Sequence, residues 1–151
     1  MISDEDGLAA LTRRMEELGA PEPGSWAGSE VSEGIAQQAR YLVLRRIWAK
    51  ALVPWRDPGV LRRNEVLAQL IERGADQDLL AEALRRVVFD AVTNVVMVLD
   101  EGHDPEAPGD APGWVLAEMD QDENATGRHV GGLHESLLEV DPDGTEAADF
   151  W

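Results

Sequence analysis

The sequence of 151 residues contains no cysteine. The absence of thiols excludes disulfides, iron–sulfur clusters, thiolate zinc sites and a cysteine nucleophile. Any metal site would therefore need histidine and carboxylate ligands. The sequence indicates no cofactor.

A long apolar run is also missing. No stretch of about 18 uncharged apolar residues occurs, because Asp90, Thr93 and Asn94 interrupt the most apolar segment. The N-terminal sequence MISDEDG is acidic, whereas a secretory signal begins with basic residues. We therefore expect a soluble, cytoplasmic protein with no membrane contact, folded as a single domain over residues 1–151.

Positive charge is scarce and unevenly distributed. The formal net charge is −17. Residues 41–95 carry seven acidic and nine basic side chains, whereas residues 96–151 carry 15 acidic side chains and one arginine, a net charge of −14. Charge of this sign repels phosphate, so direct nucleic-acid binding is disfavoured, whereas a basic protein partner would be attracted.

Helical signals dominate the first 100 residues. The sequence predicts a first helix after Ser3 that ends at Gly19, a connection over residues 20–29, a long helix over 32–53 and a third helix over 57–74. Asp57 is the predicted N-cap of the third helix, and Gly74 its C-terminal cap.

The strongest helical pattern covers residues 76–102. From Val87 onward it is apolar on nearly every side, which predicts a central helix covered on most faces. Asp90, Thr93 and Asn94 would then form a buried polar network that fixes the register of this helix. A catalytic or ligand-binding role for these three residues is the alternative.

The chain changes character after Gly102. A Pro- and Gly-rich loop leads to a predicted strand at 114–120 and a polar turn at 121–128, whereas residues 133–140 fit a helix or a strand. We predict an α+β, mainly α-helical fold, with a helical core of about four helices at 1–100 and an acidic, strand-containing cap at 101–151. Trp48 and Trp114 are expected in the core, whereas Trp26 and Trp55 are expected to pin loops.

The stretch 127–144, GRHVGGLHESLLEVDPDG, raises the question of a metal or acid–base site at His129, His134 and Glu135. The two histidines are five residues apart with two glycines between them, which does not place both on one helical face. His134-Glu135 also lacks the second histidine of a zinc-protease helix, since residue 138 is Leu. Adding His103 and Asp104 does not complete a recognised metal motif, and Ser136 lacks a nucleophile-elbow sequence.

We interpret the acidic C-terminal surface as a site for a basic protein partner. The proposed contact residues are a set of carboxylates and the terminal aromatic residue: Asp120, Asp122, Glu123, Glu135, Glu139, Asp141, Asp143 and Trp151. For Trp151, a disordered chain end is an equally good interpretation. In size, acidity and absence of cysteine the chain resembles the immunity proteins that block bacterial toxins, and this resemblance implies a cytoplasmic, non-catalytic toxin inhibitor.

Two other functions remain open. One is a small hydrolase or metal-dependent enzyme that uses the His129, His134 and Glu135 region. The other is an accessory subunit or chaperone of a larger assembly, which predicts an exposed apolar patch on the arginine-bearing helices. The sequence also leaves association between copies of the chain open.

Overall fold

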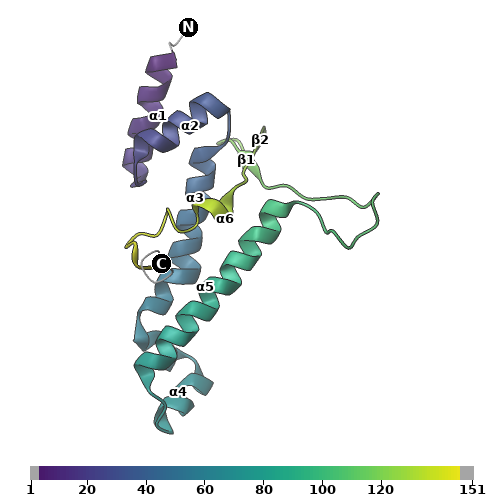
Figure 1. Ribbon diagram of the computed structural model, residues 1–151. Helices are drawn as coiled ribbons and strands as arrows, with labels where there is room; N and C mark the ends of the chain where they lie inside the picture. Colours follow the sequence, from purple (N-terminus) through teal and green to yellow (C-terminus); the bar gives the residue numbers. More distant parts are fainter. Residues whose placement is uncertain (1–3, 147–151) are drawn as a thin grey trace.

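The computed structural model describes residues 4–146 and is mainly helical, with one small two-stranded antiparallel sheet near the C-terminus (Figure 1). The predicted α+β, mainly α-helical class is confirmed. The elements in chain order are α1 (Asp4–Leu18), α2 (Pro23–Glu33), α3 (Gln37–Ile47), η1 (Trp48–Leu52), η2 (Val53–Arg56), η3 (Pro58–Arg63), α4 (Glu65–Glu72), α5 (Gln77–Glu101), β1 (Ala117–Met119), β2 (Ala125–His129) and α6 (Leu133–Ser136). Within residues 4–146, no helix is long and apolar enough to cross a membrane.

The first helix agrees with the sequence pattern, but the predicted connection at 20–29 is wrong. Most of that stretch belongs to α2, which starts at Pro23 and ends where Gly34 adopts a positive φ of 69°. Proline suits a first helical position because its missing N–H would have no partner there. Trp26 is buried, with its ring 5.6 Å from that of Tyr41 in an edge-on arrangement. Burial of the indole outweighs the weak helix propensity of the glycines and serines around it.

The predicted long helix at 32–53 begins later than expected. Gly34 ends α2, so α3 starts at Gln37 and continues through the π-helical η1 and the 3₁₀-helical η2 as far as Arg56. Trp48 lies at the junction of α3 and η1, where it is buried as predicted, and its Nε1–H donates a hydrogen bond to the Leu137 carbonyl at 2.8 Å. This hydrogen bond links the continuous helical stretch of α3 and η1 to the C-terminal segment.

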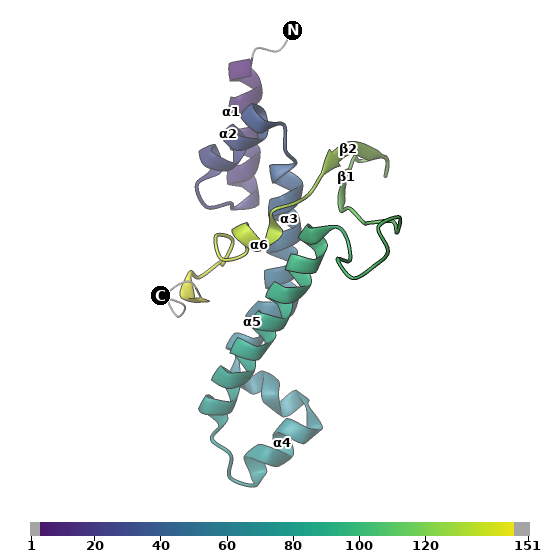
Figure 2. The ribbon, with the colours of Figure 1, turned by 45° about the vertical axis from the view of Figure 1, so that its right-hand side comes forward.

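The predicted third helix is divided in two. Asp57 caps η3 by accepting the Gly59 N–H at 2.8 Å, as expected, but Asn64 then caps a separate helix, α4. Gly74 follows α4 with a φ of 97°. Although α4 is strongly amphipathic, none of its residues is buried. Together η3, α4 and the start of α5 form an arm at one end of the molecule (Figure 2).

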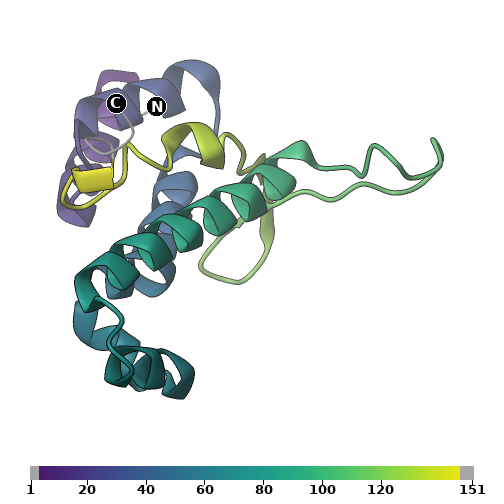
Figure 3. The same ribbon diagram turned by 60° about the horizontal axis from the view of Figure 1, so that its bottom comes forward.

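The boundaries of α5 agree with the sequence pattern, since Asp76 accepts the N–H groups of Asp78 and Leu79 and Gly102 ends the helix. Its predicted burial on most faces is wrong. Leu79, Val87 and Val95 are 67%, 61% and 60% exposed. The elements α3, η1 and α6 lie along one side of α5, and no described segment runs along the opposite side (Figures 2 and 3).

The predicted buried polar network on α5 is also wrong. Asp90 and Asn94 are exposed, and the Thr93 hydroxyl donates to the Phe89 carbonyl of its own helix at 2.9 Å. These side chains lie on or beside the uncovered side of α5, so they keep their contact with water. The burial predicted from the surrounding valines does not occur because nothing in residues 4–146 covers that side.

The C-terminal third contains the predicted strand as β1, whereas the predicted polar turn also supplies β2. The loop between α5 and β1 extends away from the helices (Figures 1 and 3). Trp114 in this loop is 41% exposed, so its predicted core position is wrong, although its Nε1–H donates to the Val98 carbonyl at 3.0 Å. The open choice for 133–140 resolves as the short helix α6 followed by turns, with Leu133, Leu137 and Val140 buried.

Candidate functional site

The turn between β1 and β2 presents three of the predicted contact residues at the surface. Asp120 accepts the N–H groups of Asp122 and Asn124 at 2.9 Å each, an Asx arrangement that shapes the turn. Asp122 and Glu123 are exposed, and within residues 4–146 their carboxylates have no hydrogen-bond or ion-pair partner. We call Asp120, Asp122 and Glu123 the turn carboxylates.

Arg128 on β2 holds this hairpin against the helices. Its guanidinium donates to both Glu118 oxygens, at 2.5 and 2.8 Å, and to Glu30 of α2 at 2.8 Å. Hydrogen bonds from Arg128 lower the pKa of Glu118 despite partial burial, and the two glutamates raise the pKa of Arg128. The base of the hairpin is therefore fixed, whereas its tip carries the turn carboxylates.

Asp141 and Asp143, also predicted as partner contacts, instead lie against Arg56. The Arg56 guanidinium donates to Asp141 at 2.6 Å and to Asp143 at 2.5 Å, and its carbon atom lies 5.1 Å from the centre of the Trp48 ring. Burial acts to raise the pKa of Asp141, but hydrogen bonds from Arg56 and from backbone N–H groups outweigh it, so the pKa is lowered.

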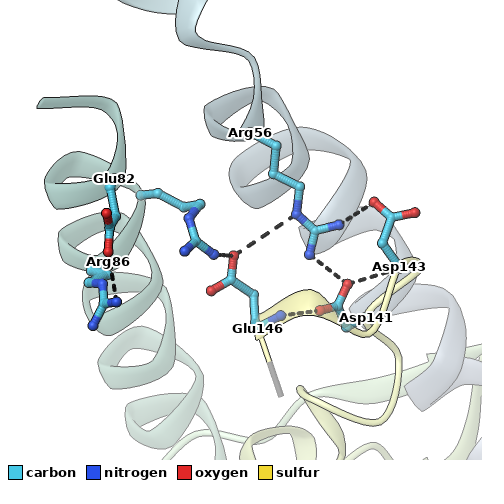
Figure 4. Close-up of polar contacts among 7 residues, drawn as sticks. Arg56, Glu82, Arg86, Asp141, Asp143 and Glu146 are labelled. Carbon is cyan, nitrogen blue, oxygen red and sulfur yellow. Dashed lines mark hydrogen bonds and ion pairs between the residues drawn. The ribbon is translucent and has the colours of Figure 1, made fainter. Parts of the chain in front are cut away.

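Glu146 completes this cluster by binding Arg85 of α5, and its carboxylate lies 3.9 Å from Arg56 (Figure 4). Its backbone N–H also donates to Asp141 at 2.9 Å. The chain from Asp141 to Glu146 is thereby attached to both η2 and α5. We call Arg56, Arg85, Asp141, Asp143 and Glu146 the arginine cluster.

Among the remaining predicted contacts, Glu135 and Glu139 are exposed, and Trp151 lies outside the described residues. The carboxylates of Glu135 and Glu139 have no hydrogen-bond or ion-pair partner in the described part of the chain. They lie around α6, whereas the turn carboxylates lie at the tip of the β-hairpin. The structure thus places the predicted acidic residues in three separate groups.

The histidines do not gather into one site. His134 bonds through Nδ1 to Asp100 of α5 at 2.7 Å, and its backbone N–H donates to the same oxygen at 2.8 Å. Burial acts to raise the pKa of Asp100, but these contacts lower it overall. Asp100 thus caps the start of α6, and this structural role accounts for the contact between Asp100 and His134. No group of three potential metal ligands occurs within residues 4–146.

A surface cavity of about 560 Å³ lies where α1, α3 and the C-terminal segment meet. Its walls include Tyr41 and Arg45, which both donate to the Leu18 carbonyl, at 3.3 and 3.1 Å. Burial raises the pKa of Tyr41 although Arg45 opposes the shift. Neither His129 nor His134 lines this cavity, so the structure does not bring the predicted histidine site to it.

The sequence reasoning missed Arg56, Arg128 and Asp100 as organising residues. The sequence contains one indication of the role of Arg128, which is the single arginine or lysine beside 15 acidic residues in 96–151. The partners of Arg56 lie 85 and 87 residues away in the sequence, a separation that local patterns do not reveal. Comparison of the chain with known protein families, curated proteins and solved structures found no match.

Proposed function

We propose that the protein is a non-catalytic interaction protein whose acidic hairpin binds a basic protein partner and neutralises or regulates it, as an immunity protein does to a toxin. The main support is the contrast at the hairpin, where Arg128 fixes the base while the carboxylates of Asp122 and Glu123 face solvent without partners in residues 4–146. A fixed surface loses little conformational entropy on binding.

Apolar side chains near the turn carboxylates add contact area for such a partner. Met119 is exposed on β1, the strand that leads into the turn, and Trp114 and Val115 are exposed in the segment that precedes β1. Exposed aromatic and aliphatic groups supply most of the affinity of a protein interface, whereas surrounding charges mainly raise the association rate. Asp141 and Asp143 contribute less to this proposal, because Arg56 already binds them.

The test starts with capture of partners from the native host, using the full chain as bait. The variant Asp120→Asn, Asp122→Asn, Glu123→Gln should associate with the captured basic protein more slowly, most clearly at low ionic strength. The matched control Glu5→Gln, Glu16→Gln, Glu72→Gln removes three exposed charges elsewhere and should have a smaller effect. A captured partner that is not basic, or equal rates for both triple variants, would refute the proposal.

A further inference from the structure

The uncovered side of α5 forms a continuous face that spans most of the helix. Residues that recur at helical spacing along it are Leu79, Ala83, Val87, Asp90, Asn94, Met97 and Val98, and all are exposed. With 1.5 Å of rise per residue, the face is about 30 Å long. We call these residues, together with Arg86 at the edge, the α5 outer face.

The chain exposes more surface than a compact monomer of its size. Its accessible surface is 10016 Å² for a mass of 16.5 kDa. The usual size relation gives about 7500 Å² for a monomer of this mass, so the excess is about 2500 Å². A stable interface needs about 800 Å² from each partner. The chain as a whole therefore exposes more extra surface than a stable interface needs from each partner.

The α5 outer face is complementary to itself in antiparallel orientation. Large apolar residues lie at both of its ends, Leu79 at one and Met97 with Val98 at the other, whereas Arg86 and Asp90 lie near the middle. A two-fold axis near residue 88 would place each Arg86 opposite Asp90 of the second copy. The same axis would place each Leu79 against the second copy's Met97 and Val98.

Charge and dipoles favour the same arrangement. Arg86 now pairs with Glu82 of its own helix at 2.8 Å, and both side chains are more than half exposed, so this bond contributes little and Arg86 is available to another carboxylate. Two antiparallel helices also align the positive end of each dipole with the negative end of the other. Most of the α5 outer face lies in residues 41–95, which carry nine basic and seven acidic side chains, so little net charge opposes the contact there.

We infer that the α5 outer face binds a second copy of this chain, giving a two-fold symmetric dimer of antiparallel α5 helices with reciprocal Arg86–Asp90 ion pairs. Such a contact is isologous, so it closes at two copies. The inference does not depend on the proposed basic partner, because the turn carboxylates are not part of the α5 outer face.

The first test is the mass of the full chain in solution, measured by light scattering and sedimentation over a range of concentrations. We expect twice the 16.5 kDa chain mass. Val87→Glu should weaken the dimer at least about tenfold, because it buries two unpaired carboxylates near the axis. Val31→Glu, an exposed position on α2, is the matched control and should leave the dimer intact. A chain that stays monomeric at every concentration would overturn the inference.

Charge reversal tests the orientation. Arg86→Asp or Asp90→Arg alone should weaken the dimer at least about tenfold, since each places like charges opposite one another twice. The double variant should restore the dimer, because the reciprocal pairs are then rebuilt with exchanged signs. The antiparallel pairing would be contradicted if neither single reversal weakened the dimer. It would also be contradicted if the double variant formed a dimer no tighter than those of the single variants.

A third test uses an introduced cysteine. Because the chain has no cysteine of its own, any disulfide between copies must form through the introduced thiol. Val87→Cys places one thiol per chain close to the proposed axis, and mild oxidation with oxidised glutathione should link two copies through a disulfide. Val31→Cys should not form the link at the same rate. Equal cross-linking of the two variants would show that α5 does not form the contact. Circular dichroism of each variant checks that helix content is preserved.

Discussion

The segment from Asp141 to Glu146 and the turn between β1 and β2 are both rich in carboxylates, but only the first lies against arginines. Asp141, Asp143 and Glu146 contact Arg56 or Arg85. The carboxylates of Asp122 and Glu123 have no such partner within residues 4–146. The same residue type therefore stabilises the fold in one place and remains available for binding in the other. What separates the two cases is the position of an arginine, which net charge does not report.

Among the substitutions that test this difference between the two acidic regions, replacing Arg56 should change the unfolding free energy most. Arg56→Met would leave Asp141 without its cation, and the side chains of Arg56 and Asp141 are only 17% and 0% exposed. Removing one partner of a buried ion pair costs about 3–5 kcal/mol of unfolding free energy. Urea unfolding followed by tryptophan fluorescence measures this loss, and Trp48 under the guanidinium should report it directly.

Arg46→Met is the control for this variant, because the Arg46 side chain is exposed and forms no hydrogen bond or ion pair with other described residues. We expect a change within about 0.5 kcal/mol for the control. If both variants lose the same stability, the arginine cluster does not fix the C-terminal segment and the contrast between the two acidic regions disappears.

Acid should weaken the same cluster through Asp141. Because its pKa is lower in the folded chain than the ordinary aspartate value of 3.8, Asp141 contributes stability that is fully present above pH 3.8. That contribution is lost as the pH falls through the folded pKa. The effect should be smaller than that of Arg56→Met, since a protonated Asp141 is uncharged and can still accept a hydrogen bond.

Unfolding free energies of the wild type and of Asp141→Asn, measured from pH 6 downward, separate this contribution from those of the other carboxylates. The wild type should lose its advantage over Asp141→Asn progressively below pH 3.8, and fully only below the lowered pKa of the folded chain, where both carry a neutral side chain at position 141. A constant difference across that range would mean that the charge of Asp141 does not stabilise the fold.

Replacing Arg128 should have an intermediate effect. Arg128→Met removes the bonds to Glu118 and Glu30, but the arginine side chain is 37% exposed and solvent screens part of the interaction. We expect a loss of about 1–2 kcal/mol. Hydrogen exchange should show faster exchange of the Val130 N–H, which bonds to the Leu116 carbonyl, with little change in α3. Unchanged exchange at Val130 would mean that Arg128 does not fix the hairpin.

The sequence predicted features that depend on neighbouring residues and failed where distant segments decide. The cap at Asp57 and the extent of the helix predicted over 76–102 follow from local chemistry, and the structure confirms them. The helix at Pro23–Glu33 was missed because packing of Trp26 against Tyr41 overrides its glycines and serines. The exposure of α5 was missed because the apolar pattern shows which residues favour burial but does not identify the segment that covers them.

In the candidate site, too, some features follow from the local sequence and others from contacts between distant segments. The exposure of Asp122 and Glu123 follows from their position in the predicted polar turn, and Asp120 ends the predicted strand directly before it. The pairing of Asp141 and Asp143 does not, because Arg56 lies 85 and 87 residues away in the sequence and reaches them only in the folded chain. Composition therefore predicts that carboxylates are present, whereas long-range packing decides which of them remain available to a partner.

The smallest effect should come from neutralising the turn carboxylates. Asp120→Asn keeps a side-chain oxygen that can accept the same two N–H groups, and the carboxylates of Asp122 and Glu123 have no partners in residues 4–146 to lose. We therefore expect Asp120→Asn, Asp122→Asn, Glu123→Gln to change the unfolding free energy by no more than about 0.5 kcal/mol. A loss above about 1 kcal/mol would show that these carboxylates stabilise the hairpin. In that case the two acidic regions would serve the same purpose, and slower binding by this variant could no longer be attributed to lost contacts with a partner.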